Sequence, residues 1–213
     1  MEISREEKAG SGYTRNRIES LSDGVFAVAM TLLVLGLSVP IITGTSMEEE
    51  LNKRLLELLP RIFLYFLSFI LLGLIWINHN FIFRFIRQPN SRMVWLNILL
   101  LMFTALLPFS TALIGDYWRF QTAVLIFGAN GIISFGLIIA LWTYARRKKL
   151  FYDGISFVNV KIRKIVDILS FTTVLIAIGI SFYNPVVTLF ILGILILSHV
   201  IATALGLHEY KST

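Results

Sequence analysis

RIESLSDGVFAVAMTLLVLGLSVP, residues 17–40, is the first apolar stretch of the chain and the one around which the fold is organised. It holds more glycine, alanine, serine and threonine than a helix facing only lipid needs. On a helical wheel, one smooth face carries Gly24, Val28, Thr31, Leu32 and Leu35. The opposite face carries the bulkier Phe26, Met30, Leu33 and Leu37. Because small residues let helices approach closely in a membrane, the pattern predicts a helix inside an assembly.

The composition is that of an integral membrane protein. Of 213 residues, 56% are hydrophobic and only 15% are charged, and the mean hydropathy is +0.78. The absence of cysteine excludes disulfides, thiolate metal sites and thiol nucleophiles. The net charge of +6 comes from basic residues that flank apolar spans, so membrane orientation explains it better than nucleic-acid binding does.

The hydrophobic pattern predicts an all-α protein in which residues 1–213 form a single unit of six transmembrane helices. The expected spans are 21–39, 58–83, 93–114, 118–144, 165–183 and 185–207. Residues 1–16 form a polar lead, and the connection from residue 40 to residue 57 is expected to be partly helical. A signal peptide is the weaker alternative, because the first run is long enough to span and no small-residue cleavage site follows it.

Lysine and arginine are distributed unequally between the two sides of this topology. Fifteen lie on the side of the two termini and the even-numbered loops, against four on the opposite side. The richest segment is 145–164, with seven. The positive-inside rule therefore predicts that both termini are cytoplasmic, and we expect the chain in the plasma or inner membrane.

The residues that open the first span have two interpretations. Ser20 and Asp23 fit a helix-capping box, with Ser20 as N-cap and Arg17 as an interfacial anchor. Alternatively, the like-charge pair Glu19 and Asp23 attracts a cationic partner. Arg17 and Asp23 are six residues apart, so a bond between them needs a break in the helix or a neighbouring element.

Three motifs in order resemble the transmembrane protein 175 family of potassium channels, in its prokaryotic branch. Arg17–Asp23 resembles the Arg-x-x-x-Phe-Ser-Asp signature of the first helix, with Leu21 in place of phenylalanine and Ser22 and Asp23 matching. Trp76-Ile77-Asn78-His79 resembles the Trp-x-x-His motif at the end of the second span. Asn97 and the run Leu106–Thr111 resemble the third span.

The resemblance implies a homotetramer in the bilayer, with the first helices lining a central pore that conducts K⁺ without any cofactor or bound metal. It implies a hydrophobic constriction in place of a carbonyl-lined filter. Aligned on Asp23, the constriction positions are Val28, Leu32 and Leu35, with Thr31 as a polar ring. Rings of Val28 and Leu35 would tend to dewet and so gate conduction, while Thr31 hydroxyls would replace water on a cation. The alternative is that this stripe is ordinary helix packing.

The resemblance also implies a polar network that joins the first three spans through Arg17, Asp23, Trp76, His79 and Asn97. His199 in the sixth span has no matching motif, and a buried hydrogen bond is its expected role. The runner-up function is a secondary or proton-coupled transporter that uses His79 and Asp23. An enzyme is not expected, since no nucleophile with a base, no paired histidines at ligand spacing and no phosphate loop occurs.

Overall fold

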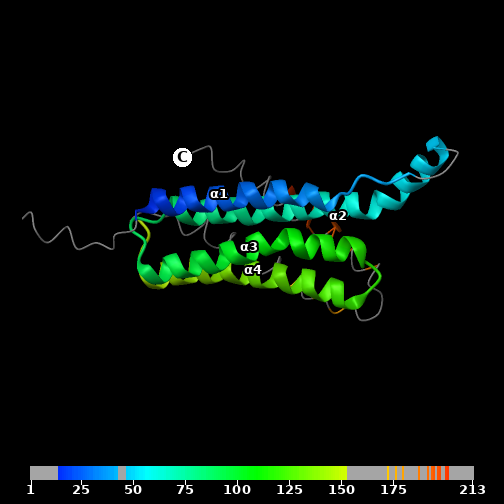
Figure 1. Ribbon diagram of the computed structural model, residues 1–213. Helices are drawn as coiled ribbons and strands as arrows, with labels where there is room; N and C mark the ends of the chain where they lie inside the picture. The colour runs from blue at the N-terminus through cyan, green and yellow to red at the C-terminus, as the bar shows by residue number, and fades with distance from the viewer. Residues whose placement is uncertain are drawn as a thin grey trace, which may run out of the picture.

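The computed structural model describes residues 14–42 and 47–152, together with eleven single positions between 172 and 201 that are all helical. Four long α-helices account for most of the described chain (Figure 1). They are α1 (Arg15–Leu33), α2 (Met47–Arg84), α3 (Ser91–Asp116) and α4 (Gln121–Arg147), and a short 3₁₀ helix, η2 (Val34–Gly36), follows α1 directly. The described chain is thus all-α apart from one isolated β-bridge, between Ile86 and Phe151.

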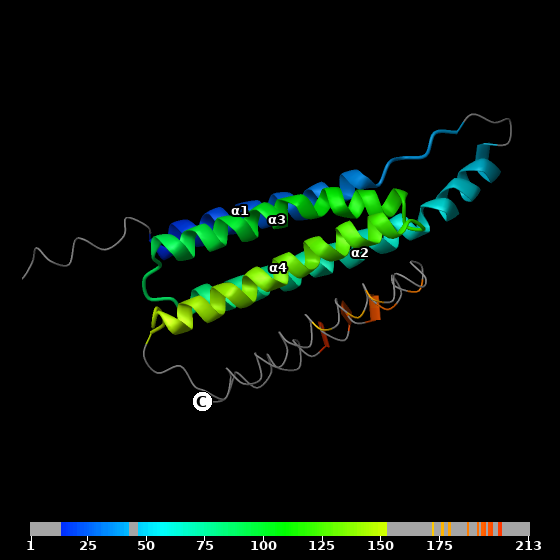
Figure 2. The same cartoon turned by 90° about the horizontal axis from the view of Figure 1, so that it is seen from below.

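The four helices alternate in direction and lie at the corners of a square. In Figure 1, α1 and α2 form the upper layer and α3 and α4 the lower one, whereas the view in Figure 2 pairs α1 with α3 and α2 with α4. Helix α1 therefore packs on α2 and α3 and lies diagonally opposite α4. The described positions between 187 and 201 lie beside α2, on the side away from α1 (Figure 2). Helix α1 keeps one outer face clear of α2, α3 and α4.

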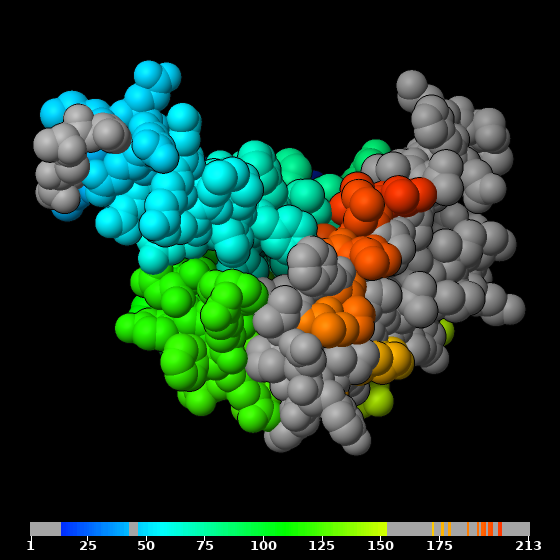
Figure 3. All heavy atoms as spheres, turned by 90° about the vertical axis from the view of Figure 1, so that its right-hand side faces the viewer, coloured from blue at the N-terminus to red at the C-terminus, as the bar shows by residue number. Residues whose placement is uncertain are grey.

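All four helices are long and apolar enough to cross a membrane, which makes this a multi-pass membrane protein. Helix α2 has 38 residues, or about 57 Å at about 1.5 Å per residue, whereas about 20 residues suffice to cross the hydrocarbon core. Its first turns project beyond the ends of α3 and α4 (Figures 1 and 2), and in the end-on view of Figure 3 they stand out to one side of the bundle. The predicted second span begins at residue 58, near Pro60 inside α2, so the polar connection before it is helical from Met47 onward.

The helix boundaries have local causes. Helix α3 begins after Asn90, whose side-chain oxygen accepts a hydrogen bond from the Met93 amide at 3.1 Å and so caps the helix. Helix α1 begins at Arg15, after Thr14, and its α-helical part ends at Leu33. The predicted first span, 21–39, is therefore displaced toward the amino terminus in the structure. The predicted fifth and sixth spans and His199 lie outside the described residues, except for the single positions.

Polar contacts join the helices at both ends. Arg61 of α2 forms an ion pair with Asp116 at the end of α3, at 2.7 Å. At the other end of the bundle, the Arg15 guanidinium donates a hydrogen bond to the backbone oxygen of Arg84 at 3.1 Å. Buried side chains between these two ends form a continuous apolar core that includes Phe26, Leu72 and Leu107.

Candidate functional site

Helix α1 has two distinct faces. Its buried face consists of Ile18, Ser22, Phe26, Ala29 and Leu33. These residues are separated by three or four positions, which is the spacing of one side of an α-helix. Only 28% of the apolar window of α1 is buried, compared with 39–50% for the other three helices. Most of the surface of α1 is therefore left for contacts outside the described bundle.

The candidate pore residues are all exposed, on α1 and on η2, which continues it. Val28 is 57% exposed, Leu32 41% and Leu35 72%, and Thr31 is also exposed. None of these four side chains is buried against the described helices. Leu35 belongs to η2 and not to α1, so its direction follows a 3₁₀ turn, a change that the helical wheel does not include.

Thr31 is oriented by a bond to its own helix. Its hydroxyl donates to the backbone oxygen of Val28 at 2.8 Å. The hydroxyl proton is thereby occupied, while the lone pairs of the oxygen are left to accept. A side chain in this arrangement presents a partial negative charge, which suits contact with a cation.

A buried chain of hydrogen bonds links α1, α3 and α2. The Ser22 hydroxyl donates to the Ile18 backbone oxygen at 2.8 Å, and the Asn97 amide nitrogen donates to Ser22 Oγ at 3.0 Å. The Asn97 amide oxygen lies 2.8 Å from His79 Nε2. All three polar side chains are at most 1% exposed. Ser22, Asn97 and His79 therefore connect three helices inside the membrane.

The direction of the hydrogen bonds from Ser22 to Asn97 and His79 fixes the tautomer of His79. Because the Ser22 proton goes to the backbone, Ser22 Oγ must accept from the Asn97 nitrogen, and the Asn97 oxygen must then accept from His79 Nε2–H. A neutral imidazole protonated at Nε2 is unprotonated at Nδ1, and Nδ1 has no hydrogen-bond partner among the described residues. The ring packs against Phe83, with centroids 4.4 Å apart. His79 therefore acts here as a donor to Asn97.

Asp23 has a different role from the one that a capping box would give it. Helix α1 begins eight positions earlier, so Ser20 and Asp23 lie inside the helix and the capping interpretation is wrong. The carboxylate of Asp23 instead accepts a hydrogen bond from Trp76 Nε1 at 2.9 Å, which joins α1 to α2. The neighbouring acid, Glu19, pairs with Arg15 at 3.1 Å. Each carboxylate of the like-charge pair thus has its own donor.

Arg17 lies apart from these contacts. Its side chain is exposed, and it makes no hydrogen bond or ion pair with the residues in 14–42 and 47–152. Arg17 lies four residues before Leu21 and eleven before Val28. These spacings put the three residues on the same, exposed side of α1. The structure thus brings together Asp23 with Trp76, and Asn97 with His79, but it leaves Arg17 outside both sets.

Two further buried polar contacts were not singled out from the sequence. Ser68 of α2 and Thr111 of α3 are joined by a hydrogen bond of 2.8 Å. The amide of Asn130 in α4 lies 3.1 Å from Ser110 Oγ in α3. A lone asparagine inside an apolar span was the available signal, because such residues hydrogen-bond across helices in membranes. These contacts join α3 to α2 and to α4.

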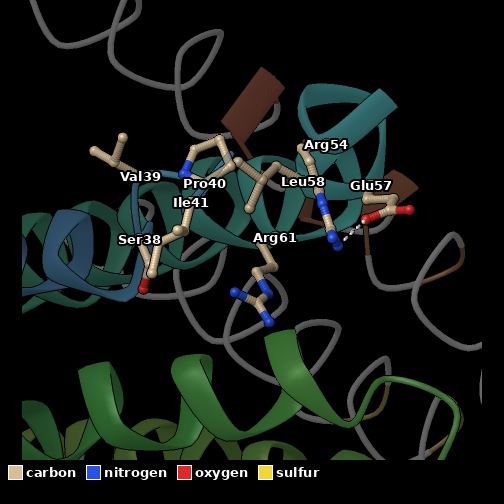
Figure 4. Close-up of a pocket in the computed structure, with 8 residues that line it drawn as sticks. All are labelled: Ser38, Val39, Pro40, Ile41, Arg54, Glu57, Leu58 and Arg61. Atoms are coloured by element: carbon tan, nitrogen blue, oxygen red, sulfur yellow. Dashed lines mark hydrogen bonds and ion pairs between the residues drawn. The ribbon is translucent and has the colours of Figure 1, made fainter. Parts of the chain in front are cut away.

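A pocket of about 430 Å³ lies at the end of the bundle where α2 projects. Its walls are the stretch after η2, from Ser38 to Ile41, and the part of α2 around Leu58 (Figure 4). Arg54 turns toward Glu57 and pairs with it at 3.3 Å, and Arg61 pairs with Asp116. Both cations of the pocket are thus already neutralised by carboxylates. No group of three metal-ligating side chains occurs among the described residues.

Comparison with known proteins identifies the family to which the sequence is similar. Residues 17–108 match the family described as endosomal/lysosomal potassium channel TMEM175. A protein of Chryseobacterium sp. (strain P1-3) named as a potassium channel is 36% identical over 121 residues, covering 57% of this chain and 59% of that protein. One from Streptomyces collinus, also named as a potassium channel, is 32% identical over 141 residues, covering 64% and 67%. The aligned part thus spans about three fifths to two thirds of these curated relatives.

A solved structure and the animal relatives point to the same family. The crystal structure of a lysosomal potassium-selective channel TMEM175 homolog from Chamaesiphon minutus superposes with a TM-score of 0.73 at 26% identity, covering 88% of this chain and 96% of that one. A human protein named endosomal/lysosomal proton channel TMEM175 is 35% identical over 102 residues, covering 45% of this chain and 20% of the human protein. The chain therefore belongs to the TMEM175 family, in its prokaryotic branch.

Proposed function

We propose that this chain is the subunit of a potassium-selective cation channel of the plasma or inner membrane. In this proposal, four six-span copies with cytoplasmic termini assemble around an axis lined by α1. The observation that carries it is the exposed stripe of Val28, Thr31, Leu32 and Leu35 on a helix whose opposite face is buried. The names of the bacterial relatives support the choice of potassium as the ion.

Apolar rings of Val28, Leu32 and Leu35 would form the constriction of this pore. A narrow ring of aliphatic side chains resists wetting, so it closes the pathway unless the helices rotate or spread. Thr31 lies between these rings and presents its oxygen lone pairs, since its proton is bonded to the Val28 backbone. The arrangement excludes anions by its polarity and gives a partly dehydrated cation one polar contact.

The buried chain from Ser22 to His79 supports this pore by setting the rotation of α1. Turning α1 by half a turn would bring Val28 into the subunit and expose Ser22, breaking its bond to Asn97. The amide nitrogen of Asn97 would then be left without an acceptor in an apolar core, although Asn97 would still bond to His79. The polar contacts on the inner face therefore determine which face of α1 looks outward.

Purified protein in liposomes tests the proposal. A channel gives single-channel current steps, whereas a carrier gives counter-transport without resolvable steps, and a protein without conduction leaves the liposomes tight. We expect Val28→Asn or Leu35→Asn to raise conductance or weaken the preference for K⁺ over Na⁺, because an amide hydrates the constriction. The control is Leu106→Asn, which places the same amide on an exposed position of α3. Equal currents in all variants would remove α1 from the pathway.

Proton permeation is the second candidate function, and the name of the animal relatives favours it. The same liposomes, loaded with a pH-sensitive dye and held without permeant metal cations, measure it directly. A proton leak that persists when K⁺ current is abolished would indicate a proton channel.

A further inference from the structure

We propose that the end of the bundle where α2 and α4 finish is a binding surface for the headgroups of anionic phospholipids. The surface consists of Arg87 and Arg92 around the α2–α3 connection and of Arg146, Arg147, Lys148 and Lys149 at the end of α4. All six side chains are exposed. We refer to these six residues as the basic surface.

Backbone contacts hold the two halves of the basic surface together. The Arg87 amide donates to the Leu150 oxygen at 2.9 Å, and the Tyr152 amide donates to the Phe85 oxygen at 3.0 Å. These bonds frame the β-bridge between Ile86 and Phe151, and both bridge partners pack at the edge of the core. Arg87 and Lys149, which are distant in the sequence, therefore lie at one place on the protein.

Lys149 adopts a backbone conformation that favours glycine. Its φ is 54°, in the left-handed region. It ends α4 in a Schellman-type turn, in which the Leu150 amide donates to the Ala145 oxygen at 3.0 Å. A glycine would adopt this conformation without steric cost. A lysine here therefore carries a charge at the expense of backbone strain, which a purely structural turn does not require.

The described carboxylates at this end each have a hydrogen-bond donor or an ion-pair partner. Within 14–42 and 47–152, the acidic residues of this end are Glu19, which pairs with Arg15, and Asp23, which accepts from Trp76. The basic surface therefore has no carboxylate counterpart in the described part of the chain. Because it lies where apolar spans end, the nearest abundant anions are lipid phosphates. Tyr152, which is half exposed beside it, suits the same interfacial layer.

A bound lipid would be coupled to α1 through the backbone bridge and one side-chain contact. The bridge joins the segment after α4 to Ile86, and the end of α2 is tied to α1 through Arg15 and the Arg84 oxygen. A headgroup that clamps the basic surface thus restrains the position at which α1 begins. The inference itself concerns binding and does not depend on conduction.

The test uses the full chain, stripped of lipid in neutral detergent and titrated with phosphatidylglycerol or phosphatidylcholine. The readouts are the number of bound lipids by native mass spectrometry and the thermal midpoint. The test variant is Lys148→Gln with Lys149→Gly. Each lysine near an anionic surface contributes roughly a fivefold factor in affinity, so we expect phosphatidylglycerol to bind roughly 25-fold more weakly. Glycine at position 149 also relieves the turn, so the variant is expected to fold at least as well as the wild type in phosphatidylcholine.

Two matched variants separate location from charge. Lys53→Gln with Arg119→Gln removes the same net charge from the opposite end and is expected to keep phosphatidylglycerol affinity. Lys148→Arg with Lys149→Arg keeps the positive charge in place and is also expected to keep the affinity for phosphatidylglycerol. Raising the salt from 0.1 M to 1 M shortens the Debye length from about 10 Å to about 3 Å and should weaken the phosphatidylglycerol effect.

Three outcomes would overturn the proposal. The first is equal stabilisation of the wild type by phosphatidylglycerol and phosphatidylcholine. The second is equal loss of affinity in the test variant and in the opposite-end variant. The third is full reproduction of the effect by inorganic phosphate, which would make free phosphate the ligand instead of a lipid headgroup.

Discussion

At the scale of the residue, the central feature is that two adjacent polar side chains of α1, the buried Ser22 and the exposed Asp23, bond to different neighbouring helices. Ser22 bonds to Asn97, and Asp23 bonds to Trp76. The adjacent residues Ser22 and Asp23 thus contact different helices, α3 and α2. Two such bonds to two neighbours fix both the depth and the rotation of α1, which apolar contacts alone would not do.

Replacing Asn97 by alanine tests the buried chain. The change leaves the Nε2–H of His79 without an acceptor and Ser22 without a donor, at side chains that are at most 1% exposed. We expect a loss of about 1 to 3 kcal/mol in stability, measured from unfolding in detergent. The control is Trp95→Ala on the same helix, at a side chain that is 66% exposed. Equal effects of the two changes would argue against a special role for Asn97.

Replacing Thr31 by valine tests the polar ring. Valine has nearly the same shape but no oxygen, so it removes the bond to Val28 and the acceptor that faces outward. We expect the K⁺ over Na⁺ preference in liposome currents to fall several-fold, with little change in thermal stability. Serine at the same position keeps the hydroxyl and should keep most of the preference. Unaltered ion preference in the valine variant would take Thr31 out of the permeation path.

At the scale of the element, α2 makes a close contact with one of the described helical positions beyond residue 187. It packs on α1, α3 and α4, and Phe63 meets the backbone at Gly193. A Cβ added to Gly193 would approach the far end of the Phe63 ring to 2.9 Å. The glycine at this helical position therefore allows a close approach to α2.

Substitutions at Gly193 should follow the room around Phe63. Alanine needs only a small rotation of the Phe63 ring, whose side chain is partly exposed, so we expect a change within about 1 kcal/mol. Leucine needs a shift of backbone and is expected to cost about 1 to 3 kcal/mol. Gly193→Leu combined with Phe63→Ala should recover part of that loss in thermal unfolding. A leucine variant as stable as the wild type would show that the two helices do not press on each other here.

At the scale of the whole molecule, the least buried of the four helices carries the most regular pattern of exposed residues. Helix α1 lies at a corner of the square and keeps its outer face clear of the other three described helices (Figure 2). A membrane helix of this kind faces either lipid or further copies of the chain. Its small residues Gly24 and Thr31 favour contact with other helices.

Cross-linking in a single-cysteine background decides between these two surroundings. The natural chain contains no cysteine, so Leu35→Cys supplies the only thiol. If α1 helices meet at a shared axis, oxidation in native membranes should give linked dimers of the chain in high yield. Leu106→Cys, an exposed position on α3, is the control and should link poorly. Linking of Leu106→Cys alone would place α3, and not α1, between the copies.

Much of the organisation follows from the sequence because it is local. The four described spans are visible as apolar runs of membrane length, and the two faces of the first helix appear on its wheel, since helical periodicity depends only on neighbours along the chain. The exact ends of the helices were harder to predict from the sequence. Ser20 and Asp23 satisfy a capping pattern, yet the helix begins at Arg15, because good helix formers before them extend it.

By itself, then, the sequence determined the membrane class, the order and approximate positions of the four described helices, and the residues that share the smooth face of the first span. Only the tertiary structure decided which face of α1 looks inward, and that Ser22 and His79 meet at Asn97 while Arg17 stays outside. The physical reason is separation along the chain. Ser22 and Asn97 are 75 positions apart, and no local pattern specifies how two helices rotate against each other until their side chains pack.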